Sequence, residues 1–256
     1  MRRIHPLAIS LLGVISVTCP RTLLADRLEE QYKHASELLW AGDLQEAQSE
    51  FEAILHKKKN YKSAKVLLGL TLARLSNQSE KQGDRIEAIS QLRQALSLDP
   101  QEAYWHSALA KLLHAQGNAD EAANECAQAA RLSPEDSDLA RGCGFGLSPL
   151  LVNDKTVTSV SGPPKNGSPT PPRPVYNPNP AYSEKARLAR LHGVIVLSLV
   201  VSAEGEVTQA AISQPLGLGL DESALNTVRT WKFEPATRNG APIPDRVMVE
   251  VSFRLF

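Results

Sequence analysis

Three stretches of the sequence share one pattern: GDLQEA at residues 42–47, GDRIEA at residues 83–88 and GNADEA at residues 117–122. Each begins with a glycine, continues with an Asp or Asn that can cap a helix, and reaches a Glu-Ala pair. The second and third stretches start 34 residues apart, whereas the first and second start 41 apart. The sequence therefore predicts a helical repeat with an insertion in one unit, expected around residues 76–82.

The residues downstream of each glycine fit the same repeat. Apolar or small residues recur nine and twelve positions after the glycines, namely Phe51, Leu92 and Cys126, then Ile54, Ala95 and Ala129. Pro100 and Pro134 each follow their glycine by 17 positions and are expected to end a helix, because proline has no backbone N–H. Gly69 and Ala110 fall where a small residue lets two helices approach closely.

Residues 27–140 thus resemble about three tetratricopeptide repeats. The first unit is degenerate, with Ala35 at the small position and Lys59 where the other units have a terminal proline. The resemblance implies an α-helical solenoid whose concave face binds an unknown protein or peptide. The alternative is that the repeats act only as a spacer or a dimerisation unit.

The composition changes after the repeats. Eight prolines lie between Pro163 and Pro180, interspersed with glycine, asparagine and serine. Such a stretch does not build a packed core and favours an extended chain. We therefore expect residues 148–180 to form a proline-rich linker between two domains.

The segment 181–256 has the first strand-like alternation in the chain. Ser183 is expected to cap a short helix that ends at Gly193. Residues 194–201 are rich in β-branched side chains, and residues 207–212 follow a turn as the hairpin partner.

The rest of this segment completes a small α+β domain. Asp221 is expected to cap a second helix, whose apolar stripe reaches Trp231. A final strand alternates between an apolar side, Val247 to Leu255, and a polar side. The pattern predicts a three-stranded antiparallel sheet with one half-buried face covered by two helices.

Several short motifs in this domain resemble the C-terminal domain of the TonB family. The motifs are Tyr182 with Ala186-Arg187, Gly193 before a valine-rich strand, Gly205-Glu206-Val207, Leu220-Asp221-Glu222-Ser223-Ala224, Trp231-Lys232-Phe233-Glu234-Pro235-Ala236 and Gly240-Ala241-Pro242-Ile243-Pro244. Ser183 departs from the family, which usually has proline after the tyrosine. The residues assigned to the structural motif are Tyr182, Gly193, Gly205, Asp221, Trp231, Phe233 and Pro235.

The resemblance implies a cell-envelope protein of a Gram-negative-type bacterium that supports transmembrane transport. Family members bind a short peptide of an outer-membrane TonB-dependent receptor by adding it to a sheet edge. The expected peptide-binding edge is the final strand, with Val247, Met248, Val249, Glu250, Val251, Ser252, Phe253 and Arg254. Trp231, Phe233 and Pro235 are expected to be core and corner residues. The alternative is a periplasmic interaction scaffold without energy transduction, including one that forms a strand-swapped homodimer.

The first 25 residues resemble an export signal. A positive start at Met1-Arg2-Arg3 precedes an apolar run of 11 residues, Leu7 to Val17. As a helix this run rises about 16 Å, well short of the ~30 Å hydrocarbon core of a bilayer. Cleavage after Ala25 would release the chain into the periplasm. An uncleaved inner-membrane anchor and a lipoprotein at Cys19 are the alternatives.

The cysteines allow two interpretations. After signal cleavage Cys126 and Cys143 would remain, 17 residues apart, and an oxidising compartment would permit a disulfide between them. The interpretation that we favour from sequence is that Cys126 packs between helices as a small apolar side chain.

Composition and motifs argue against several other classes of protein. Lys and Arg together number 28, as do Asp and Glu, so the chain lacks the basic surplus of a nucleic-acid-binding protein. The six histidines have no metal-ligand spacing, and no phosphate-binding loop or nucleophile elbow occurs. We therefore expect no catalytic residues, no metal, no cofactor and no nucleic-acid partner.

Overall fold

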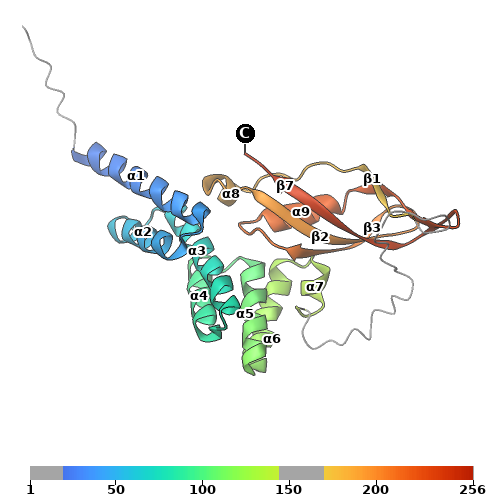
Figure 1. Cartoon of the computed structure of the whole chain (residues 1–256), viewed down its shortest axis with the longest axis horizontal. Helices are drawn as coiled ribbons and strands as arrows, with labels where there is room; N and C mark the ends of the chain where they lie inside the picture. The colour runs from blue at the N-terminus through green and yellow to red at the C-terminus, as the bar shows by residue number, and fades with distance from the viewer. Residues whose placement is uncertain (1–19, 144–169, 256) are drawn as a thin grey trace, which may run out of the picture.

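The computed structural model describes residues 20–143 and 170–255, with side chains from Arg27 onward in the first helix. Residues 1–19, which hold most of the predicted export signal, and residues 144–169, which hold most of the predicted linker, lie outside the described part. The described residues form a row of helices followed by a β-rich domain beside it (Figure 1). This arrangement confirms the predicted fold class.

The helical part consists of three pairs and one additional turn. The pairs are α1 (Pro20–Ala41) with α2 (Leu44–Lys57), α3 (Lys62–Lys81) with α4 (Arg85–Leu98), and α5 (Ala103–Gln116) with α6 (Ala119–Leu132), and α7 (Ser137–Ala140) follows. Gly42, Gly83 and Gly117 lie at the turn within each pair with φ of 94°, 86° and 94°. Only glycine adopts such angles at little cost, which explains its recurrence in the repeat.

The predicted caps are only partly formed. Asp84 is the N-cap of α4, and its carboxylate accepts a hydrogen bond from the Glu87 backbone N–H at 3.0 Å. Asp43 and Asn118 occupy the same position in the other two pairs, but their side chains make no capping bond. The sequence pattern thus locates all three N-cap residues correctly, but only Asp84 makes the expected side-chain hydrogen bond.

Most of the insertion lies at the C-terminal end of α3, and its last residue, Gln82, lies in the turn before Gly83. This helix has 20 residues, whereas its counterpart α5 has 14. The helices α2 and α4 are equal in length, with 14 residues each. The repeat therefore absorbs most of the extra residues as added helical turns rather than as a loop.

The helices approach one another closely at the small residues. A Cβ on Gly69 would lie 3.0 Å from Cη2 of Trp105, so glycine lets the Trp105 ring of α5 lie against α3. Ala35 and Ala110 are fully buried at the corresponding positions. Pro100 and Pro134 lie two residues beyond the ends of α4 and α6, as predicted.

The structure contains the disulfide that we do not favour from sequence, and it also packs Cys126 as a small apolar side chain. Cys126 of α6 and Cys143 after α7 form a disulfide, with their Cα atoms 5.8 Å apart. Both residues belong to a small apolar cluster with Ala103, Ala129 and Leu139. Packing as a small apolar side chain and disulfide formation are therefore compatible here, and the disulfide ties α7 to the last repeat.

The C-terminal domain contains three small sheets. Its elements are β1 (Arg173–Tyr176), α8 (Glu184–Leu188), β2 (Gly193–Val201), β3 (Val207–Gln214), α9 (Leu220–Val228), β4 (Lys232–Glu234), β5 (Ala236–Arg238), β6 (Ala241–Ile243) and β7 (Asp245–Phe253). The main sheet has the order β3-β2-β7, and all its pairs are antiparallel. The other two sheets are the pairs β1-β4 and β5-β6.

Two details of this domain differ from the sequence prediction. The segment 148–180 is not wholly a linker, since residues 173–176 form β1 and pair with β4. Pro174 sits in an edge strand, where a missing N–H is tolerated. Helix α8 ends at Leu188, and Gly193 instead begins β2, where an added Cβ would lie 2.8 Å from Cδ1 of Leu216.

The buried apolar side chains form a core that runs through both parts of the molecule. One continuous cluster includes Phe51, Leu67 and Leu109 from the helices together with Ile195 and Leu225 from the C-terminal domain.

Among residues 20–143 and 170–255, no helix is both long enough and apolar enough to span a bilayer.

Candidate functional site

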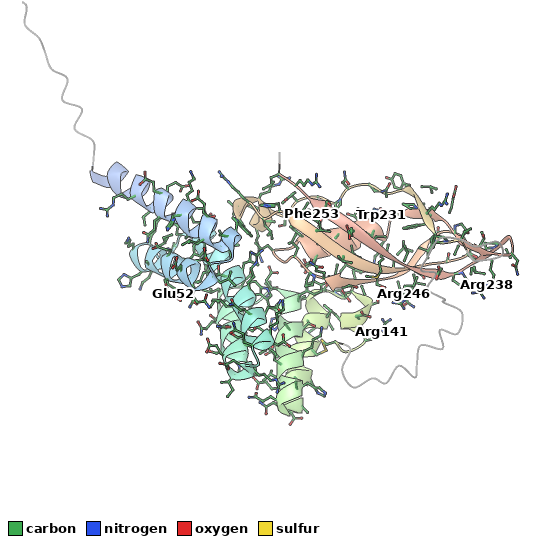
Figure 2. The ribbon with its side chains drawn as sticks, in the orientation of Figure 1. Glu52, Arg141, Trp231, Arg238, Arg246 and Phe253 are labelled. Carbon is green, nitrogen blue, oxygen red and sulfur yellow. A yellow bond between two sulfur atoms is a disulfide. The ribbon has the colours of Figure 1, made fainter. Side chains whose placement is uncertain are left out.

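The candidate peptide-binding edge is formed by β7. This strand pairs on one side with β2 over nine residues, from Gly193↔Phe253 to Val201↔Asp245, without a shift in register. Its other side has no strand partner in the described sheet, because the order is β3-β2-β7. Arg246 and Phe253 mark the two ends of this strand (Figure 2).

The register indicates which backbone groups of β7 point away from the sheet. On β3, the N–H of Ile212 points outward, because it donates to a carboxylate outside the sheet. In an antiparallel pair, a residue whose N–H points away from the pair lies opposite a residue whose N–H and C=O also point away. That second residue therefore bonds the strand on its other side. Leu197 is the partner of Ile212 and therefore bonds Val249 of β7. The backbone groups of Met248, Glu250 and Ser252 consequently face outward.

The side chains of β7 alternate as the sequence predicts. Val251 and Phe253 are buried, and Val247 and Val249 are half-buried on the same side. Met248 is 55% exposed, and Glu250 and Ser252 are also exposed. Arg254 and Leu255 follow the strand and are exposed, so Leu255 does not extend the apolar side. The edge thus has an apolar row on one side and a polar, accessible row on the other.

Two aromatic motif residues make defined contacts within the domain, and one of them packs against the end of β7. Tyr182 packs edge-on against Phe253, with ring centroids 5.4 Å apart, and its hydroxyl donates to the Leu191 carbonyl at 2.7 Å. Trp231 is buried, and its indole N–H donates to the Pro178 carbonyl at 3.1 Å.

The remaining motif residues shape the end of the domain near β4. Phe233 is buried in β4, and Pro235 is half-buried between β4 and β5. Trp231 lies beyond the end of α9 rather than on it, although it is buried together with that helix. Gly205 has φ of 82°, and its carbonyl accepts the Phe233 N–H at 2.9 Å.

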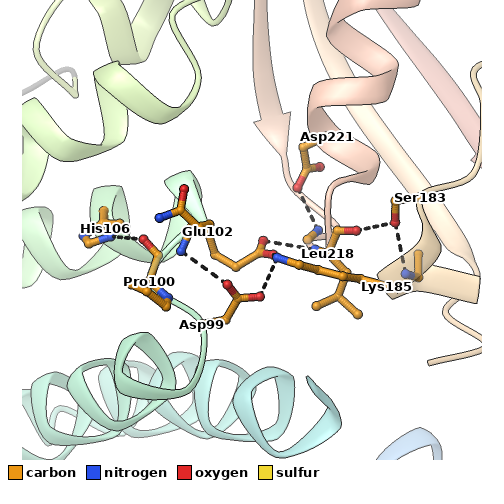
Figure 3. Close-up of polar contacts among 11 residues, drawn as sticks. Asp99, Pro100, Glu102, His106, Ser183, Lys185, Leu218 and Asp221 are labelled. Carbon is orange, nitrogen blue, oxygen red and sulfur yellow. Dashed lines mark hydrogen bonds and ion pairs between the residues drawn. The ribbon is translucent and has the colours of Figure 1, made fainter. Parts of the chain in front are cut away.

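Asp221 does not cap α9, which corrects the sequence prediction. The N-cap is Gly219, with φ of 78°, and Asp221 lies within the first turn. Its carboxylate is buried and turns back to accept the backbone N–H groups of Leu216 at 2.9 Å and Gly217 at 2.7 Å. It therefore holds the loop between β3 and α9 (Figure 3).

The protonation of Asp221 gives a testable pH dependence. Burial raises its pKa from 3.8 to about 7, against the opposing effect of the two backbone N–H donors. An acid with a raised pKa in the folded state binds its proton more tightly there, so stability falls as pH rises between about 4 and 7. We expect chemical denaturation to show a steeper loss of unfolding free energy over this window in the native protein than in Asp221→Asn. Equal slopes would contradict the raised pKa.

A residue of the repeats contacts the opposite edge of the sheet. The Ile212 N–H of β3 donates to Oδ2 of Asp136 at 2.8 Å. Asp136 also accepts the Tyr104 hydroxyl at 2.9 Å, and its other oxygen caps α7 through the N–H groups of Asp138 and Leu139. Burial and the Asp136 carboxylate raise the pKa of Tyr104, which keeps this phenol protonated as a donor.

No sequence pattern marks Asp136, or Glu102, which accepts the Leu218 N–H at 3.1 Å, as a contact with the C-terminal domain. Both are acidic residues near helix starts, a position that many exposed acidic residues share. The only local signal is Pro134, which ends α6 and leaves room for a new cap at Asp136. Their partners are backbone groups of β3 and of the loop after it, which no local pattern reveals.

The histidines hold no metal site in the described part of the chain, where no group of three possible ligands occurs. His106 instead makes two hydrogen bonds, to Oε2 of Glu125 at 2.6 Å and to the Pro100 carbonyl at 3.1 Å. These contacts join α5 to α6 and to the end of α4.

Comparisons with known proteins agree with this geometry. Residues 178–255 match the family model described as the Gram-negative bacterial TonB protein C-terminal, and residues 80–143 match a tetratricopeptide repeat model. Curated relatives named Protein TonB are 30% identical in Vibrio cholerae and 35% identical in Xanthomonas campestris, each over 77 residues, or 30% of this chain. The chain spans about a third of the length of these relatives, 32% and 34% respectively.

Solved structures resemble part of this chain. The type III secretion translocator chaperone SycD of Yersinia enterocolitica is 20% identical, covers 45% of this chain and 83% of its own, and gives a TM-score of 0.31. A tetratricopeptide repeat protein of Parabacteroides merdae is 22% identical, covers 44% and 42%, and gives a TM-score of 0.34. The two families matched by residues 80–143 and 178–255 are protein-interaction families rather than enzyme families. The chain therefore joins residues that match a tetratricopeptide repeat model to a C-terminal domain that matches the TonB C-terminal model.

Proposed function

We propose that this chain is a TonB-like protein of the bacterial cell envelope that binds outer-membrane transport receptors by strand addition at β7. The proposal rests on one observation: from Val247 to Phe253 the outer side of β7 has no strand partner among the described residues, in a domain that matches the TonB C-terminal model. A receptor segment lying along β7 would complete hydrogen bonds with Met248, Glu250 and Ser252. In this role the chain supports transmembrane transport.

The side chains along β7 suggest how such a segment would be chosen. Backbone pairing supplies affinity for any extended peptide, and side chains supply selectivity. The half-buried Val247 and Val249 favour apolar residues on one face of the added strand. Met248 and Glu250 contact the other face, where a flexible thioether and a carboxylate favour apolar and basic residues respectively. Arg254 lies beyond the strand and would contact only the end of a bound segment.

Peptide titration into the full chain tests this proposal. The probes are synthetic peptides that copy the periplasmic segments of the TonB-dependent receptors of the same organism, with binding followed by calorimetry. Saturable binding of at least one peptide is expected. A control peptide with N-methylated backbone nitrogens on alternate residues cannot donate to an edge strand and should not bind. Indifference to every receptor peptide would contradict the proposal.

The second candidate is a periplasmic scaffold that does not transduce energy. The observation that favours it is the pattern of contacts across the two parts of the chain, which holds the TonB-type domain against the repeats. In that case β7 would pair with β7 of a second copy, giving a homodimer. Sedimentation of the full chain separates the two candidates, because a receptor-binding monomer stays monomeric without peptide.

The repeats were predicted to recruit a second protein on their concave face. The C-terminal domain of the same chain lies over α3 and α5, so another protein would have to displace it or bind elsewhere on the repeats.

A further inference from the structure

Two buried acids of the repeats accept backbone N–H groups of the C-terminal domain. Glu102 is 4% exposed and accepts the Leu218 N–H at 3.1 Å, and Asp136 is 1% exposed and accepts the Ile212 N–H at 2.8 Å. A buried carboxylate that lacks partners is strongly destabilising. These two side chains are therefore placed for contact with the C-terminal domain rather than for solvent.

Three ion pairs, made by two basic residues, flank these contacts. Lys185 of α8 lies 2.5 Å from Asp99 and 3.2 Å from Glu102, which connects the first helix of the C-terminal domain to the start of α5 (Figure 3). Arg229 donates to the Glu135 carbonyl at 2.7 Å and lies 3.1 Å from its carboxylate. Each pair combines a basic residue of the C-terminal domain with acidic residues of the repeats.

Leu218 is held in an unusual conformation between the two parts. Its φ is 56°, which is costly for a leucine, and its side chain is fully buried. Glu102 accepts its N–H, and the Ser183 hydroxyl donates to its carbonyl at 2.5 Å. Ser183, where the TonB family usually has proline, thus helps to fix the residue that Glu102 contacts.

The loop that contains Leu218 covers a face of the repeats. A cavity of about 360 Å³ lies between residues 214–217 and the helices α3 and α5. Three of its lining residues, Ser76, Asn77 and Glu80, belong to the extra turns of α3. The insertion in this repeat therefore extends the face toward the C-terminal domain.

We propose that the binding partner of this repeat face is the C-terminal domain of the same chain, and that the repeats close the β3 edge of its sheet. Asp136 occupies the position that a carbonyl of an added strand would need beside Ile212. The disulfide between Cys126 and Cys143 ties α7, and with it Asp136, to the last repeat. The repeats then act as an internal clamp that leaves β7 as the open edge of the sheet.

The docking of the C-terminal domain on the repeats does not depend on the proposed receptor function. Its consequence, that a peptide binds at β7 and not at β3, does rest on that function. With β3 closed, a receptor peptide or a second copy can extend the sheet only at β7, which prevents association at both edges. Any other protein that binds this face of the repeats would compete with residues 214–217.

Hydrogen exchange on the full chain without peptide tests the docking. The measured quantity is the exchange rate of the Ile212 and Leu218 amides relative to that of Leu199 in the central strand β2. The variant Lys185→Glu/Arg229→Glu places like charges against Asp99, Glu102 and Glu135, and should raise both ratios at least tenfold. The control Arg187→Glu/Arg173→Glu makes the same change in net charge at exposed positions outside the contacts and should leave both ratios unchanged.

A rescue variant makes the interpretation specific. Adding Asp99→Lys and Glu135→Arg to the reversed variant restores opposite charges and should return both ratios toward the native values. Unchanged ratios in the reversed variant would overturn the docking, including the case in which all three amides accelerate together through unfolding. Peptide titration gives an independent result, because a chain that binds no receptor peptide can still show the expected exchange ratios.

Discussion

Replacing Glu250 with proline is expected to weaken binding of a receptor peptide by about 30-fold or more. The Glu250 N–H faces away from the sheet, so proline removes a donor that an added strand would use and leaves the ladder to β2 intact. A lost backbone hydrogen bond costs about 1 kcal/mol, and the ring also obstructs the two adjacent bonds, which gives about 2 kcal/mol in total. Calorimetric titration of the peptide into the full chain measures this change.

The matched control is Glu250→Ala, which removes the side chain and keeps the N–H. If binding depends on backbone pairing, the alanine variant should retain affinity within a few-fold of the native protein. Equal losses in both variants would show that the carboxylate rather than the backbone carries the binding. Native-like thermal unfolding of Glu250→Pro is expected, since edge strands tolerate proline where the N–H faces solvent.

Replacing Gly205 with alanine is expected to lower the free energy of unfolding by about 3 kcal/mol or more. Two effects add: its φ of 82° is unfavourable for alanine, and the new Cβ would lie 2.0 Å from the Phe233 carbonyl oxygen. The turn between β2 and β3 would have to move away from β4, which breaks the bond between the Phe233 N–H and the Gly205 carbonyl. Urea unfolding of the full chain measures the loss.

Gly240 provides the control for this prediction. It has a similar φ of 81°, but no atom lies within 4 Å of an added Cβ. Gly240→Ala should therefore cost only the backbone strain, about 1 kcal/mol. A loss at Gly205 no larger than that at Gly240 would mean that the close contact with β4 does not constrain the domain.

The elements predictable from sequence are those whose cause is local. The spacing of Gly83 and Gly117 reflects the left-handed turn within each helix pair, and alternation along residues 247–253 reflects a strand with one buried side. The block from Trp231 to Ala236 carries a family resemblance because its aromatic residues are buried at fixed places in the domain. Each of these features is determined by residues close in the chain.

The features missed depend on residues distant in the chain. Strand β1 is hidden among prolines, and only its pairing with β4 makes it a strand. Asp221 is a residue type that commonly caps helices. In the structure Gly219 is the N-cap, and the Asp221 carboxylate turns to the preceding loop. The contacts of Glu102 and Asp136 with the C-terminal domain span 116 and 76 residues, so no periodicity or motif indicates them.

The same limit applies to the site itself. The resemblance to the TonB family predicts the final strand, β7, as the edge that binds a peptide. It cannot show that β3, the other edge, meets the repeats through Asp136. The difference matters for function, since a sheet with one open edge has one place for an added strand.

The most direct test of the account is hydrogen exchange on the full chain with and without a bound receptor peptide. If a strand adds at β7, the amides of Met248, Glu250 and Ser252 should slow markedly on binding, while the Ile212 amide of β3 keeps its rate. Slowing confined to β3 or to the repeats, with β7 unchanged while the peptide is bound, would contradict the account.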